Sequence, residues 1–142
     1  MKKLIYLSAL ALSLCIALPA FAETMSQIWK QTTPADKMFY VAGFKDGYEV
    51  CLGITKNSLL TKEGADSGKV KSISELSQYL KADDKTIVAE LDTFYSDDAN
   101  ANIPFHYAVI YVTQRLSGIS EQDLKEGLDE MRKSALENLK EK

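Results

Sequence analysis

Apolar positions three and four residues apart recur through most of the chain, which is the spacing of an amphipathic helix. The first such segment, residues 25–29, is short and ends in Trp29, the only tryptophan, which we expect to anchor it in the core. Thr33 and Pro34 supply a capping hydroxyl and a first-turn proline. A second helix should therefore start there, and its apolar spacing continues to about Gly53.

The middle of the chain has a weaker pattern. Residues 57–71 contain two glycines and scattered charges without periodicity, which predicts the longest loop and the most mobile segment. Ser72 and Glu75 have the spacing of a capping box, so a short helix should begin there. Asp83 or Asp84 should cap the next helix.

Residues 103–116 allow two interpretations. They are rich in β-branched and aromatic residues, a composition typical of strands. Their apolar character is continuous rather than alternating, however, and the segment is long enough for a helix. With Asn102 as its cap, Pro104 in its first turn and Gly118 as its stop, a buried helix is favoured.

The C-terminal segment is the clearest helix. Ser120 and Asp123 form a capping box at its start. Charged residues cover the rest of its surface, and we expect ion pairs at i,i+4 spacing such as Glu121–Lys125. Its apolar stripe consists of Leu124, Leu128, Met131, Ala135 and Leu139. Five or six helices without a hairpin signal predict an all-α fold, a compact single-domain bundle.

The N-terminus has a different character. Two lysines precede the apolar run 4–18, and a small-x-small pattern follows at 20–22. This layout predicts a secretory signal peptide, residues 1–22, cleaved before Glu23. A permanent anchor is the alternative, but the run is shorter than the roughly 20 residues that span a bilayer. We therefore expect a periplasmic domain of residues 23–142 that does not contact the membrane after cleavage.

Charge narrows the possible partners. The chain has 17 Lys and Arg against 20 Asp and Glu, and two of the lysines belong to the predicted signal peptide. The exported domain would then carry a net charge of −5, because 15 basic residues face the same 20 acidic ones. Nucleic acids and anionic membranes attract clustered Lys and Arg, so this balance argues against both.

Three residues between 43 and 51 form a possible interface. Gly43 and Gly47 lie four positions apart in the second helix, which predicts a close approach by another helix or a large aromatic side chain. Cys51 would be the only cysteine of the exported domain, so an internal disulfide is excluded. Its apolar neighbours favour a buried thiol, and a bond to a second chain is the alternative.

No catalytic constellation is visible in the sequence. His106 is the only histidine, and no serine lies in a nucleophile motif. A structural zinc site would need several cysteine or histidine ligands. We therefore expect neither an enzyme nor a bound cofactor.

The acidic segment 97–102 resembles part of a calcium loop. Asp98, Asn100 and Asn102 alternate like its first three ligands, but the positions that need glycine and glutamate hold Ile103 and Val109. Asx residues between helices are also typical of caps and turns, and this interpretation is favoured over ion binding.

Two stretches resemble a known pattern. The first is Trp29 followed by Lys37, Tyr40, Val41, Gly43, Phe44 and Gly47. It resembles the opening of small exported helical bacterial proteins, among them immunity proteins that neutralise type VI secreted cell-wall amidases. The second is Phe94, Tyr95, Asp97, Asn100, Ile103 and Pro104, which is similar to a signature of small periplasmic proteins without assigned function.

The resemblance implies a protein that acts by binding. The leading hypothesis is an immunity-like inhibitor or accessory factor with a protein partner. The signature makes Tyr95, Asp97, Asp98, Asn100 and Asn102 a tentative binding or structural motif. In the structural interpretation the phenol of Tyr95 closes over a turn and the amide of Asn100 caps a helix.

Two other hypotheses remain open. One is a small-ligand-binding protein or enzyme that uses an aromatic cleft formed by Tyr95, His106 and Tyr107. The other is a homodimeric structural protein joined through the Gly43 and Gly47 face or through Cys51.

Overall fold

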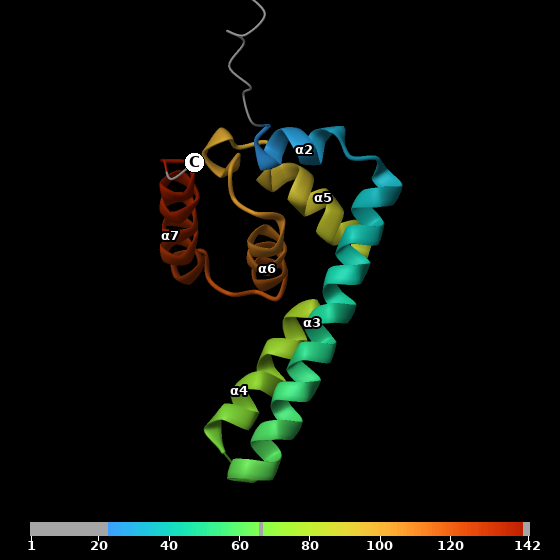
Figure 1. Cartoon of the computed structure of the whole chain (residues 1–142), viewed down its shortest axis with the longest axis vertical. Helices are drawn as coiled ribbons and strands as arrows, with labels where there is room; N and C mark the ends of the chain where they lie inside the picture. Colours follow the sequence, from blue (N-terminus) through green and yellow to red (C-terminus); the bar gives the residue numbers. More distant parts are fainter. Residues whose placement is uncertain (1–22, 66, 141–142) are drawn as a thin grey trace, which may run out of the picture.

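The computed structural model describes residues 23–65 and 67–140. These residues form six α-helices and two short 3-10 helices, and they contain no strand (Figure 1). The predicted all-α class is therefore confirmed. No helix in the described ranges is long and apolar enough to cross a membrane. The predicted signal peptide lies outside these residues. The elements are α2 Met25–Gln31, α3 Pro34–Glu63, α4 Gly68–Leu76, η1 Ser77–Lys81, α5 Asp84–Phe94, η2 Asp98–Asn100, α6 Phe105–Leu116 and α7 Glu121–Lys140.

Side-chain caps begin three helices where the sequence predicts them. The hydroxyl of Thr33 accepts a hydrogen bond from the backbone N–H of Asp36 at 3.2 Å. The carboxylate of Asp83 accepts one from the backbone N–H of Thr86 at 3.0 Å. Ser120 and Asp123 form the predicted capping contact at the start of α7. The predicted cap of α6 is wrong, because Pro104 occupies the cap position in place of Asn102 and no side chain caps this helix.

The predicted loop at residues 57–71 is also wrong. Helix α3 continues to Glu63 and α4 starts at Gly68, which leaves a connection of only four residues. The distal part of α3 stays helical because it packs along α4. The predicted start at Ser72 lies inside α4, where its hydroxyl donates to the Gly68 carbonyl and Ser67 is the cap.

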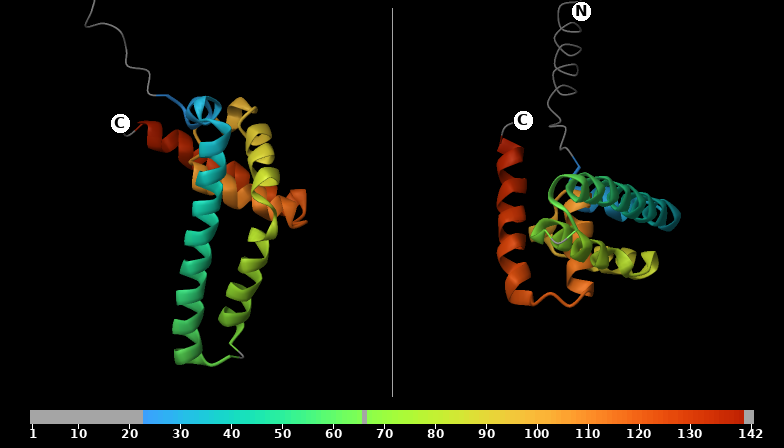
Figure 2. Two further views of the ribbon diagram at one scale, coloured as in Figure 1. Left: turned by 90° about the vertical axis from the view of Figure 1, so that its right-hand side faces the viewer. Right: turned by 90° about the horizontal axis from the view of Figure 1, so that it is seen from below.

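The molecule consists of a helical body and a projecting arm. Helix α3 is the longest element, with 30 residues. Its first half packs against α5, while its second half and α4 form a two-helix arm that extends away from α6 and α7 (Figures 1 and 2). Helix α7 packs on α6, on the side of the body away from α3 (Figure 2).

The core of the body is centred on Trp29, which is buried as predicted. Its ring lies 6.4 Å from Tyr40, 6.0 Å from Tyr95 and 5.4 Å from Phe105, measured between centroids. Its indole N–H donates to a carboxylate oxygen of Asp92 at 2.8 Å. The side chain that begins the first resemblance motif is thus a structural anchor of the body.

The predicted burial of α3 at positions 43–51 is wrong. No atom lies within 4 Å of a Cβ built at Gly43 or Gly47, so nothing in the described residues approaches them closely. Cys51 is exposed rather than buried. The physical reason is that α3 packs on one side only, against α5 in its first half and α4 in its second, which leaves its other side in solvent.

Candidate binding groove and the turn that positions it

The signature residues form a tight turn between α5 and α6. The buried hydroxyl of Tyr95 donates to the carbonyl of Ile103 at 2.7 Å and so closes the turn. The amide of Asn100 donates to the carbonyl of Phe94 at 2.8 Å, at the C-terminus of α5. A helix end leaves carbonyl groups without intrahelical partners, and Asn100 satisfies one of them. These two contacts are the ones that the structural interpretation of the signature predicts.

Arg132 connects this turn to α7. Its Nε donates to the side-chain oxygen of Asn100 at 2.9 Å, and its terminal nitrogen donates to Asp97 at 2.7 Å. The sequence predicts that Arg132, like the other charged residues of α7, faces solvent. This prediction is wrong, because Arg132 is bound to the turn. Nothing in the helical spacing distinguishes it from the neighbouring charged residues, because its partners lie more than 30 positions earlier.

Ser26 connects the turn to α2. Its amide donates to the carbonyl of Ala101 and its hydroxyl donates to the carbonyl of Tyr95, both at 2.9 Å. Sequence reasoning missed this residue, since a serine in a short amphipathic helix carries no signal of its own. The turn therefore holds together the ends of α2, α5 and α6 and the middle of α7.

The calcium interpretation of this segment is not supported by its geometry. The amide oxygen of Asn100 that a calcium ion would need already accepts from Arg132. Asp98 is exposed and Asn102 is half-buried. In the described ranges no group of three His, Cys, Asp or Glu residues is arranged to hold a metal ion.

The two resemblance motifs meet in one cluster. Val41 from the first motif and Ile103 from the second are both fully buried in the same core. Lys37 lies over the ring of Trp29 at 5.0 Å and pairs with Asp92 at 2.7 Å. The motifs therefore describe the packing of α2 and α3 against the turn rather than an exposed reactive site.

Tyr95 gives this turn a pH dependence. Burial raises the pKa of the Tyr95 hydroxyl above its ordinary value, and the neighbouring Tyr40 raises it further. The native state therefore retains this proton more strongly than the unfolded chain does. The resulting stabilisation is fully present below pH of about 10 and is lost as the pH rises above that value.

Replacing Tyr95 with phenylalanine tests the contribution of its hydroxyl to stability and to the pH dependence of stability. The variant should lose about 1 kcal/mol of unfolding free energy at neutral pH, because the Ile103 carbonyl loses its donor. Urea unfolding between pH 7 and about pH 11 should show a steeper fall for the wild type than for Tyr95→Phe. Tyr107→Phe is the matched control and should follow the wild type. Equal slopes for wild type and Tyr95→Phe would contradict this role.

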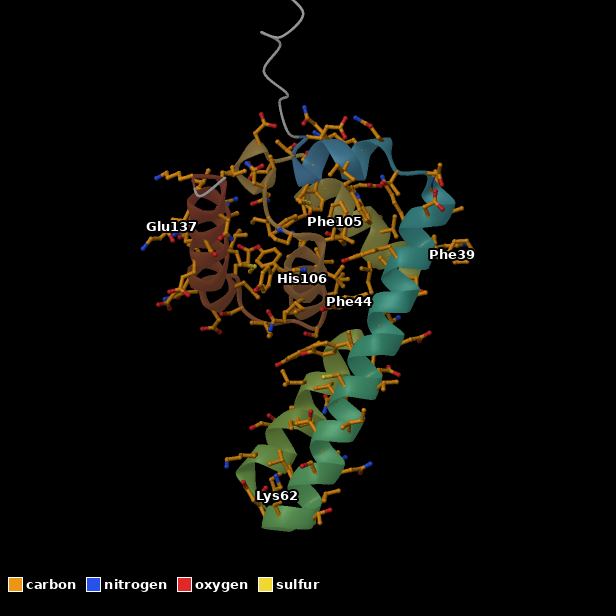
Figure 3. All side chains as sticks on the ribbon, in the orientation of Figure 1. Phe39, Phe44, Lys62, Phe105, His106 and Glu137 are labelled. Atoms are coloured by element: carbon orange, nitrogen blue, oxygen red, sulfur yellow. The ribbon has the colours of Figure 1, made fainter. Side chains whose placement is uncertain are left out.

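A groove opens beside the turn, between the start of α6 and the middle of α7. Its volume is about 220 Å³. Tyr107 is 48% exposed on its wall, and the ring of His106 lies 4.1 Å from that of Tyr107. Figure 3 shows His106 on α6. The lining residues are Pro104, Tyr107, Gly127, Glu130, Met131, Ser134, Ala135 and Asn138.

The turn fixes both walls of this groove. Pro104 follows Ile103, whose carbonyl is held by Tyr95, so the start of α6 is fixed in position. On the other wall, Met131 precedes Arg132, which ties α7 to Asn100. The signature residues thus determine the geometry of the groove without lining it, apart from Pro104.

Of the three residues expected to form an aromatic cleft, only Tyr107 lines the groove. Tyr107 lines the groove and His106 lies beside it, but Tyr95 is fully buried and its hydroxyl is bound to Ile103. A larger hollow of about 500 Å³ lies along the outer face of α7. It is more open and its lining is polar and charged, whereas the smaller groove presents an aromatic ring and a methionine.

The lining of the groove is mostly uncharged. Glu130 and Tyr107 are its only titratable lining residues. Among the described residues, no buried side-chain nitrogen or oxygen lacks a hydrogen-bond partner. The chain matches no family model, no curated protein and no solved structure.

Proposed function

We propose that this chain is exported to the periplasm and acts by binding another protein through the groove between α6 and α7. The observation that carries the proposal is the half-exposed Tyr107 beside Met131 in a groove whose walls are tied in place. Aromatic residues and methionine are enriched at protein interfaces. A fixed groove also binds at a lower entropic cost than a mobile one.

Charge indicates the kind of partner. Glu130 lies in the groove, and the exported domain carries five more acidic than basic residues. A partner with a basic surface would associate faster and in a defined orientation. We therefore propose a partner that inserts an apolar side chain into the groove and places a basic residue near Glu130.

A finer proposal follows from the resemblance motifs. The partner would be a secreted cell-wall amidase, and the chain would be its immunity-like inhibitor. The resemblance supports this choice of partner, while the groove supports binding only. Adding the purified chain to an amidase encoded beside its own gene should suppress release of soluble peptidoglycan fragments. Unchanged release at saturating concentration would overturn the finer proposal and leave an accessory factor.

Tyr107→Ala should weaken partner binding at least tenfold, which corresponds to about 1.4 kcal/mol. The reason is that truncation removes the aromatic side chain from the groove wall, where interface energy concentrates. The tagged chain would capture its partner from periplasmic and secreted fractions, and titration calorimetry would then compare the affinities of the variants.

The matched control is Leu136→Ala. Leu136 is 56% exposed on the same helix, α7, but does not line the groove. Its truncation should leave the affinity unchanged. Equal losses for both variants, or a Tyr107→Ala variant that binds like the wild type, would remove the groove from the proposal.

A further inference from the structure

Helix α7 contributes little to the buried core. It packs mainly on α6, on the side of the body away from α3 (Figure 2). Within the described residues, Ala135 is the only buried member of the core cluster that α7 supplies, and a methyl side chain buries little apolar surface. Leu128 and Met131 are only partly buried against the cluster. The remaining buried members come from α2, α3, α5, α6 and the turn, so the core is nearly complete without α7.

The contact between α6 and α7 is hollowed at both ends. The groove occupies one end, beside the start of α6. A second hollow of about 460 Å³ lies at the other end, between Tyr111 and Arg115 of α6 and Leu128 of α7. The two helices are therefore closely packed over only part of their length. Such a contact has fewer dispersion interactions to lose on separation than a continuous one.

One side chain ties α7 to the earlier elements. Among the hydrogen bonds of the described residues, only those of Arg132 make this connection, to Asn100 and Asp97. Arg132 also lies 3.9 Å from Asp129 on its own helix, measured from nitrogen to oxygen. Its charge therefore keeps a carboxylate partner when α7 moves away. Asp97, whose side chain is 51% exposed, returns to water at little cost.

The turn keeps its other hydrogen bonds when α7 leaves. Tyr95 donates to the carbonyl of Ile103, and Ser26 donates to that of Tyr95. Asn100 donates to the carbonyl of Phe94. None of these bonds involves α7, and the side-chain oxygen of Asn100 becomes open to water. The rest of the body therefore has the contacts to stay folded while α7 is away.

We propose that α7 undocks from α6 as a unit while the rest of the body stays folded, and that Arg132 is the latch that holds it. The docked state predominates, and in it the groove is fixed. Undocking removes Met131 and Ala135 from the groove, so a partner that uses the groove binds the docked state alone and shifts the equilibrium toward it. This last consequence rests on the proposed function, whereas the undocking itself does not.

Hydrogen exchange of backbone amides, read by mass spectrometry on the purified protein without a partner, tests the undocking. We expect the central amides of α7, residues 126–134, to be protected at least about tenfold less than those of α5. The reason is that α5 exchanges only when the body unfolds, whereas α7 exchanges whenever it undocks. Equal protection of the two helices would mean that they open together, and it would overturn the inference.

Arg132→Met tests the latch, because it removes the donors but retains an aliphatic side chain with a similar helix propensity. It should speed exchange at residues 126–134 at least about fivefold. Lys125→Gln is the matched control, since the ion pair of Lys125 with Asp129 lies within α7. It should change the same rates by less than about twofold. An equal effect of the two variants, or no effect of Arg132→Met, would overturn the assignment of the latch.

Val41→Ala tests whether α7 opens independently of the body. Val41 is fully buried on α3, on the side of the body away from α7. Its truncation should speed exchange in α5 at least about fivefold. Residues 126–134 should stay within about twofold of the wild type, because the docked and undocked states lose the same contacts.

Acceleration of α7 as large as that of α5 would show one cooperative unit and would overturn the inference. These measurements use no partner protein, and therefore their outcome is separate from that of the groove proposal.

Discussion

Trp29→Ala should remove about 3–5 kcal/mol of unfolding free energy, a large share of the 5–15 kcal/mol that stabilises a typical domain. Trp29 fills the centre of the body, against Tyr40, Tyr95 and Phe105. Truncation leaves a cavity that these rings cannot close, and it also removes the hydrogen bond to Asp92.

Urea unfolding followed by circular dichroism measures this loss. Leu136→Ala is the control, and truncation of that exposed side chain should change the unfolding free energy by less than about 0.5 kcal/mol. If Trp29→Ala unfolds at the wild-type midpoint, Trp29 does not anchor α2 and the described core is incorrect.

Asn100→Ala should cost about 2–4 kcal/mol, the second-largest expected effect. The buried amide satisfies the Phe94 carbonyl and the Nε of Arg132 at once, so its removal leaves both groups without a partner. The buried Phe94 carbonyl left without a donor costs about 1–3 kcal/mol, and the lost hydrogen bond to the partly exposed Arg132 guanidinium adds about 1 kcal/mol. Denaturant unfolding of Asn100→Ala, Arg132→Ala and the double variant gives the coupling between the two residues.

Asp98→Ala is the matched control for this turn, because Asp98 is exposed two positions away. It should change the unfolding free energy by no more than about 0.5 kcal/mol. Additive losses for Asn100→Ala and Arg132→Ala would show that the two side chains act independently, contrary to their contact in the structure.

The sequence predicts those parts of the fold that depend on local chemistry. Caps such as Thr33, Asp83 and Ser120 act within three residues of themselves, so their signal is complete in a short window. Gly118, with a φ of 88°, ends α6 as expected, because this backbone conformation favours glycine.

Helical spacing likewise identifies most of the apolar stripe of α7, since Leu124 and Ala135 are buried. Leu139 is wrongly included, because it lies near the end of the helix and is 47% exposed.

The parts that could not be predicted depend on distant contacts. Residues 57–63 are helical because α4 folds back along them, which no short window reveals. Cys51 has apolar neighbours, yet a two-helix arm cannot bury every side of α3. Lys125 pairs with Asp129 rather than with Glu121. Both carboxylates lie four positions from Lys125, so spacing alone does not decide between them.

The sequence predicts the structural roles of the signature residues but not the location of the groove. The signature suggested that Tyr95 and Asn100 are structural, and their hydrogen bonds are those of a closed turn and a helix cap. The groove, however, joins Tyr107 on α6 to Met131 on α7. Arg132 brings these helices into register through contacts that span more than 30 residues, and sequence spacing carries no record of them.

Site-specific photo-crosslinking in living cells tests the central claim most directly. A benzophenone amino acid would replace Tyr107 in the groove or Leu136 elsewhere on α7. Binding through the groove predicts a discrete adduct with a second protein from position 107 and none from position 136. The absence of an adduct at position 107, or equal adducts at both positions, would contradict the account.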